Sequence, residues 1–144
     1  MLREGKDVAL LALGSMVSTA LSAAEVLGEQ GIDCAVANAR FAKPLDAELI
    51  LDLARRTRRV VTLEEGILGG GFGSSVLQLL ARAGLRDIGI ETVGLPDEFI
   101  EHGPRELLLR QFGLDAEGIA RRVAAAFPEL GGRPTIKLLE EIAG

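Results

Sequence analysis

The chain has 144 residues, with 16 basic and 21 acidic side chains and a net charge of −5. This length is sufficient for one domain with a hydrophobic core. The acidic balance, with no Trp or Tyr and five Phe, argues against nucleic-acid binding, which uses basic stripes and stacking aromatics. The single cysteine excludes an intrachain disulfide and favours an intracellular, cytoplasmic location. No apolar run is long enough for a bilayer, and residues 1–7 lack a signal-peptide pattern, so no membrane partner is expected.

Apolar runs alternate with helical periodicity along the chain. The run at 8–13 predicts a strand buried on both faces, and a helix from Val17 to Leu27 follows, with Gly31 as a left-handed terminator. A second strand at 32–37 precedes a helix that Asp46 caps and that ends near Arg56. The remaining elements are strands at 59–63 and 88–94 and helices at 76–84, 104–111 and 116–127.

This order predicts the α/β class: a single three-layer domain with a mostly parallel sheet of about five strands and helices on both faces. Four strands are evident, and the short segment Phe99–Ile100 is one candidate for a fifth. We expect the domain to cover residues 1–127. Residues 128–144 then form a tail that is partly helical or disordered.

The most informative segment is a glycine-rich turn between the third strand and the following helix. It contains Glu64, Glu65, Gly69, Gly70, Gly71 and Gly73. Open α/β sheets bind ligands or partners at this carboxyl edge of the strands. A dinucleotide fingerprint, G-x-G-x-x-G, is not present, because the sixth position is Ser74 when counted from Gly69 and Val76 when counted from Gly71.

Electrostatics also oppose a phosphate site at this turn. Two unit charges about 4 Å apart repel by roughly 4 kcal/mol at an effective dielectric constant near 20. An exposed helix N-terminus offsets only about 0.3–1 kcal/mol of this repulsion. Two interpretations are therefore preferred. The glycines allow close backbone packing while a Glu side chain bonds the next helix's free N–H groups, or the turn forms a subunit or domain contact.

The other candidate residues give no convincing catalytic set. Glu64 and Glu65 are adjacent on a strand and point to opposite faces, which disfavours an acid–base pair. His102, with Asp97 nearby, lies in a turn-rich loop, and one His with one Cys offers no zinc cluster. Cys34 falls in a predicted buried strand, where a thiol acts as a small hydrophobe. The arginines at 55, 56, 58 and 59 are interpreted as a helix-end cluster, with an anionic partner as the alternative.

Several segments together point to a family. They are Val61–Gly66 with Gly69–Ser74, the loop Leu95–Gly103, Phe112–Ile119, Ala12–Val17 and Ala39–Asp46. Over roughly residues 5–127 the chain resembles the transketolase C-terminal domain family. Within that group it most closely resembles the C-terminal domains of 1-deoxy-D-xylulose-5-phosphate synthases. Transketolases and the β subunits of 2-oxoacid dehydrogenases share the acidic glycine motif.

The resemblance implies a larger homodimeric parent enzyme that uses thiamine diphosphate and magnesium. Such synthases join pyruvate to glyceraldehyde 3-phosphate with loss of carbon dioxide, in isoprenoid precursor synthesis. The resemblance places the cofactor and catalytic residues in upstream domains, so no catalytic, cofactor-binding or metal residue is assigned here. This chain is expected to be an inactive scaffolding and dimer-contact domain. The alternatives are the corresponding domain of a transketolase or 2-oxoacid dehydrogenase β subunit, or a stand-alone nucleotide-binding module.

Overall fold

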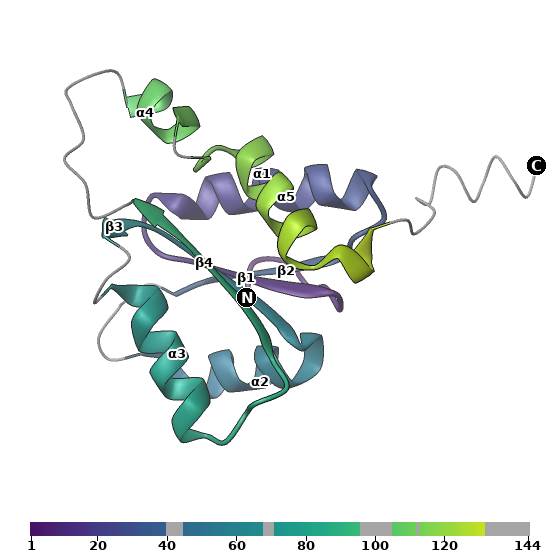
Figure 1. Ribbon diagram of the computed structural model, residues 1–144, viewed down its shortest axis with the longest axis vertical. Coiled ribbons are helices and arrows are strands. Elements are labelled where there is room, and N and C mark those ends of the chain that lie inside the picture. Colours follow the sequence, from purple (N-terminus) through teal and green to yellow (C-terminus); the bar gives the residue numbers. More distant parts are fainter. Residues whose placement is uncertain (40–44, 68–70, 96–104, 112, 132–144) are drawn as a thin grey trace, which may run out of the picture.

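A computed structural model describes residues 1–39, 45–67, 71–95, 105–111 and 113–131. The fold has three layers around a parallel sheet with strand order β2-β1-β3-β4. Helices α1 and α5 cover one face of this sheet, and α2 and α3 cover the other (Figure 1). The α/β class and the helices on both faces are therefore confirmed.

The strands are β1 (Val8–Ala12), β2 (Cys34–Asn38), β3 (Arg59–Ile67) and β4 (Gly89–Leu95). The sequence predicted about five strands, and the described residues form four. The proposed fifth strand at Phe99–Ile100 lies outside the described residues. Near the chain start, a single antiparallel bridge joins Arg3 to Val36 on the free edge of β2. One bridge is too short to count as a strand.

The helices are α1 (Met16–Glu29), α2 (Ala47–Thr57), α3 (Phe72–Arg82), α4 (Arg105–Gln111), α5 (Ala116–Ala126) and the 3-10 turn η1 (Pro128–Leu130). The predicted N-cap at Asp46 is confirmed, because its side chain accepts a hydrogen bond from the Leu49 amide at 3.2 Å. Gly31 adopts the expected left-handed conformation after α1, with φ of 83°.

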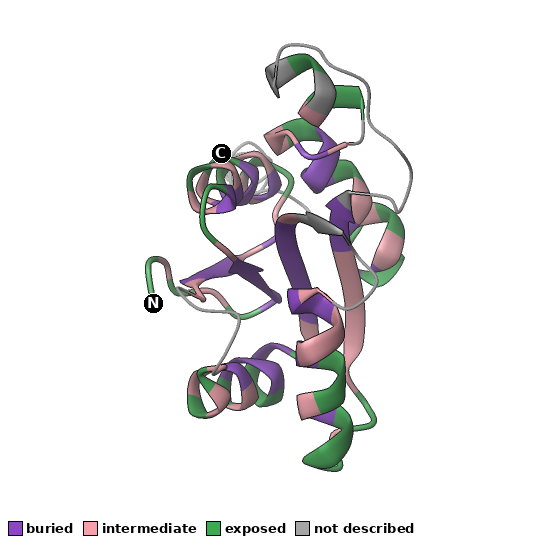
Figure 2. Ribbon diagram, turned by 90° about the vertical axis from the view of Figure 1, so that its left-hand side faces the viewer, coloured by how far each residue is buried: buried purple, intermediate pink, exposed green. Residues whose placement is uncertain are grey.

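Each face of the sheet has its own hydrophobic core (Figure 2). The larger core lies under α1 and α5 and includes Leu10, Leu27 and Ile119. The smaller core, under α2 and α3, includes Leu53, Phe72 and Leu80. Burial on both sides explains why β1 is apolar at every position. Leu130 is also fully buried in the larger core, while the division of the chain at residue 127 stays a prediction.

Two of the four arginines in the predicted cluster, Arg56 and Arg59, form ion pairs in the folded domain. Arg56 pairs with Asp52 and Glu4, at 2.9 and 3.3 Å. Arg59 pairs with Glu129 at 2.8 Å, and its guanidinium also donates to the Asp7 carbonyl. Among the described helices, none is long and apolar enough to cross a membrane.

The segment before β1 is held along the edge of β2 by its backbone. The Leu2 amide donates to the Val36 carbonyl at 2.9 Å, and the Val36 amide donates to the Arg3 carbonyl at 2.9 Å. Gly5 lies so close to the backbone of Cys34 and Ala35 that a Cβ atom there would overlap with it. A glycine is therefore required where this segment packs against the backbone of β2.

Replacing Gly5 with Ala should consequently lower the free energy of unfolding, by about 1–3 kcal/mol, since the added methyl displaces the first segment from β2. Gly28→Ala is the matched control. Its Cβ would make only an ordinary 3.5 Å contact with Arg3, and Ala favours helix by about 0.5–1 kcal/mol. Urea unfolding followed by circular dichroism measures both. Equal stability of the two variants would contradict the close packing at Gly5.

Candidate functional site

The candidate site lies where β3 leads into α3, at the carboxyl edge of the sheet (Figure 1). The strand continues through Glu64 and Glu65 to Ile67, beyond the predicted end at residue 63, with an irregularity in its pairing to β4 between Leu63 and Ile67. Glu64 therefore sits inside the sheet and is only 2% exposed. Its Oε2 atom accepts a hydrogen bond from the Gly73 amide at 3.0 Å. This confirms the interpretation that a Glu side chain bonds the next helix's free N–H groups.

Two opposing effects act on the Glu64 carboxyl group. Burial raises its pKa because it penalises the charged form, whereas the amides of Gly73 and Phe72 lower it by bonding the carboxylate. Burial has the larger effect, so the pKa lies above its usual value. Oε1 has no hydrogen-bond partner among the described residues, so a proton on this group would reside there without disturbing the bond to Gly73.

This geometry bears on whether α3 could bind an anion. A phosphate at a helix N-terminus uses the first free amides of the helix. In this chain those amides, Phe72 and Gly73, already interact with Glu64. An incoming phosphate would have to displace a carboxylate that the protein itself supplies. The start of α3 is therefore organised for internal attachment to β3.

Gly73 is the second constraint on this junction. A Cβ atom at Gly73 would lie 2.8 Å from Thr62 Oγ1 and 2.9 Å from Thr92 Cγ2, closer than packed side chains approach. Thr62 and Thr92 are paired across β3 and β4 and present their side chains to α3. Sequence reasoning missed both threonines. The available signal was a polar residue inside the apolar run of β3.

The remaining predicted site residues are less informative. Glu65 is partly buried, and Gly71 is the N-cap of α3 in an extended conformation, with φ of −87°. Gly69, Gly70, Asp97 and His102 lie outside the described residues. Within the described part of the chain, no group of three His, Cys, Asp or Glu side chains could hold a metal ion.

Cys34 lies in β2 and is fully buried, as predicted. Burial raises the pKa of its thiol to about 12. The thiol is therefore protonated at neutral pH and acts as a small hydrophobic side chain rather than as a nucleophile.

The raised pKa of Glu64 predicts a pH dependence of stability. The folded state binds this proton more tightly than the unfolded chain, so the contribution of Glu64 is fully present below the unfolded pKa and is lost as pH rises through the folded pKa. Glu64→Gln lacks this titration. Acidification from neutral pH should therefore stabilise the wild-type chain relative to Glu64→Gln in urea unfolding. A wild-type advantage that grows as pH rises would contradict this sign, and Glu65→Gln controls for general charge effects.

Gly73→Ala should destabilise the fold by about 1–3 kcal/mol, because the new methyl group meets Thr62 and Thr92. Thr92→Ser removes the Cγ2 atom from this contact. In the double variant Gly73→Ala/Thr92→Ser, part of the lost stability should return, which a double-mutant cycle of unfolding free energies measures. Strict additivity of the two substitutions would show that a clash with the side chain of Thr92 is not the reason why Gly73→Ala is destabilising.

Known proteins resemble this chain in both sequence and structure. It is 51% identical over 142 residues to a 1-deoxy-D-xylulose-5-phosphate synthase of Pelotomaculum thermopropionicum, an alignment that covers 99% of this chain and 22% of that protein. A protein of the same name from Thermomicrobium roseum is 54% identical over 125 residues, or 87% of this chain and 20% of that protein. The chain thus spans about a fifth of the length of these curated relatives.

Among solved structures, one titled "Split gene transketolase, inactive beta4 tetramer" aligns with a TM-score of 0.81 and 40% sequence identity. The alignment covers 88% of this chain and 41% of that one. The family described as "Transketolase, C-terminal domain" matches residues 1–119. The match covers both the acidic strand β3 and the glycine-constrained start of α3. The chain therefore belongs to the transketolase C-terminal domain family.

Proposed function

We propose that this chain is the C-terminal scaffolding and dimer-contact domain of a 1-deoxy-D-xylulose-5-phosphate synthase. The complete enzyme would be a cytoplasmic homodimer that condenses pyruvate with glyceraldehyde 3-phosphate and releases carbon dioxide. The chain itself would be inactive. Its role would be to complete the fold of each subunit and to contribute to contacts with the upstream domains and the second subunit.

The observation that carries this proposal is the alignment with the Pelotomaculum synthase. Nearly the whole chain aligns at 51% identity, yet it matches only 22% of that protein. This coverage supports a role for the segment as one domain in contact with the remaining four-fifths of such a protein. The β3–α3 junction fits a structural role, because its buried carboxylate bonds the protein's own backbone at Gly73.

Thiamine diphosphate and magnesium are the cofactors that the proposed parent enzyme implies. The described residues do not fit either group, since Glu64 already bonds the first amides of α3 and no cluster of cation ligands is present among these residues. We therefore propose that both bind upstream of this chain. When bound, thiamine diphosphate supplies the stabilised carbanion chemistry that decarboxylation needs.

A transketolase parent is the second candidate, favoured by the 40% identity to a solved split-gene transketolase. The two candidates differ in chemistry, because only the synthase reaction releases carbon dioxide from pyruvate. A stand-alone nucleotide-binding module is less well supported, given the bonding of Phe72 and Gly73 to Glu64.

The test uses the Pelotomaculum protein in three forms: intact, lacking the segment that aligns with this chain, and with that segment replaced by this chain. We expect the truncated form to lose dimerisation and carbon dioxide release from pyruvate with glyceraldehyde 3-phosphate. The chimera should recover both. Sedimentation and a product assay provide the readouts.

The isolated 144-residue chain serves as the control and should show no turnover. Turnover by this chain alone, or full activity of the truncated form, would contradict the proposed role. A chimera that folds but transfers two-carbon units between sugar phosphates, without releasing carbon dioxide, would favour the transketolase parent.

A further inference from the structure

Residues 1–3 fix the direction in which a preceding polypeptide would leave this domain. Arg3 lies opposite Val36 in an antiparallel bridge, so the chain, followed back from Arg3 towards Met1, runs towards the carboxyl end of β2. Asn38 is the last residue of that strand. A polypeptide that precedes Met1 would therefore leave the domain at the carboxyl end of β2. In a parallel sheet this is the edge at which β1, β3 and β4 also end.

Several contacts hold this direction in place. At the other end of the segment, the Asp7 amide donates to the Asp33 carbonyl at 2.9 Å, and the Asp33 amide donates to Asp7 Oδ2 at 2.8 Å. Gly5 fits against the β2 backbone between the two ends. The orientation thus depends on backbone bonds and close packing, which leave the segment little freedom to reverse.

Exposed apolar surface gathers where the segment begins. Met1 and Leu2 are 45% and 50% exposed, and they are two of the four large apolar side chains exposed in the described part of the chain. A polypeptide that precedes Met1 and packs against this end of the segment would cover both side chains. Their position agrees with the direction of the bridge.

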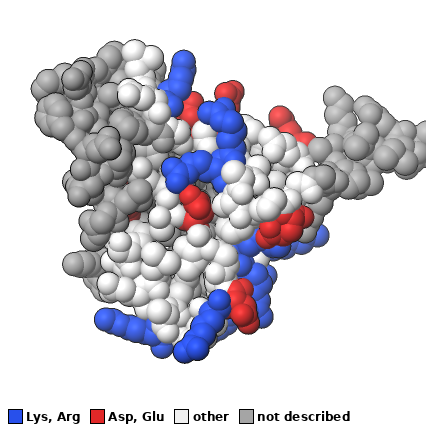
Figure 3. Space-filling model, in the orientation of Figure 1, with Lys and Arg blue, Asp and Glu red and all other residues white. Residues whose placement is uncertain are grey.

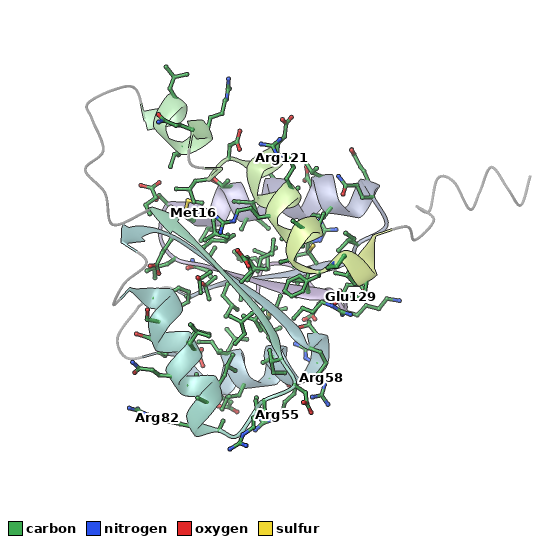
Figure 4. The ribbon with its side chains drawn as sticks, in the orientation of Figure 1. Met16, Arg55, Arg58, Arg82, Arg121 and Glu129 are labelled. Carbon is green, nitrogen blue, oxygen red and sulfur yellow. The ribbon has the colours of Figure 1, made fainter. Side chains whose placement is uncertain are left out.

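The opposite edge of the sheet has a different chemistry. Arg55 and Arg58 at the end of α2, Arg82 at the end of α3 and Arg86 beyond it are exposed, and none forms an ion pair within the described residues. Figure 4 places Arg55, Arg58 and Arg82 at the lower end of the molecule, away from Met16 at the start of α1, and Figure 3 shows basic side chains gathered at that lower end. Burying unpaired guanidinium groups costs free energy, which favours leaving this edge in water.

We propose that the carboxyl edge of the sheet, at Ser15, Asn38 and Gly71, is the surface on which the upstream part of the same polypeptide packs. This inference rests on the proposed function, because it assumes the additional length that the relatives have. On this proposal the carboxyl edge of the sheet forms the contact, and the arginine-rich edge stays exposed to solvent. The occupant is the polypeptide that directly precedes Met1, since the chain direction delivers it to this edge.

Hydrogen exchange compares the isolated chain with the chimera described above. Amides of the β1–α1 turn at 13–15 and the start of α3 at 73–75 should exchange about tenfold or more slowly in the chimera. Amides at 83–88, between α3 and β4, should exchange equally in both. Protection at 83–88 instead, or at neither edge, would overturn the assignment. The exchange map does not require an active chimera, so its outcome is independent of the catalytic test.

A matched pair of substitutions provides a second measurement. Ser15 and Ala83 are both exposed and lie at opposite edges, the latter directly after α3. Ser15→Arg should lower the Tm of the chimera by more than it lowers the Tm of the isolated chain, in which a cation at the N-cap of α1 is only mildly unfavourable. Ala83→Arg should leave both unchanged. A loss of stability confined to Ala83→Arg in the chimera would place the contact at the arginine-rich edge.

Discussion

The bond between Glu64 and the start of α3 is the interaction on which the carboxyl edge depends. A carboxylate on β3 accepts from the Gly73 amide, and the Phe72 amide also favours its charged form. Unpaired buried amides cost about 1–3 kcal/mol each, so the first turn of α3 is stable only when it meets this group. The helix is thereby fixed to one position on the strand. The carboxyl edge acquires a defined shape although glycines surround it in the sequence.

Gly73 and the two threonines limit the same junction sterically. The amide of Gly73 must approach Glu64, while its Cα hydrogen faces Thr62 and Thr92. A larger residue would push the helix away from the strand and lengthen the bond to Glu64. Hydrogen bonding and packing therefore require the same residue at this position. Its φ angle is not in the left-handed region, so close approach rather than backbone freedom is the reason for the glycine.

Much of the fold could be predicted because its elements carry strong local signals. Strands buried on both faces are continuous apolar runs, and Asp46 marks a helix start through its bond to the nearby Leu49 amide. The antiparallel segment on β2 was missed because its bonds join backbone atoms and leave no side-chain pattern. The extension of β3 was missed because charged residues are rarely buried. The partnership of Glu64 with α3 was predicted as one alternative, but its threonine neighbours come from β3 and β4 and meet only in the folded sheet.

Burial of a carboxylate also bears on the contact proposed for this edge, because it disfavours a phosphate there. The charge of Glu64 is enclosed, since this side chain is 2% exposed, and the exposed side chain of Ser15 at the β1–α1 turn is uncharged. A neighbouring domain could pack over Glu64 without removing water from its carboxylate. An anion would gain little, because the helix amides are bonded and a carboxylate lies beneath them. The same side chain that orders α3 thus makes this edge unfavourable for anions, which agrees with the protein contact proposed for it.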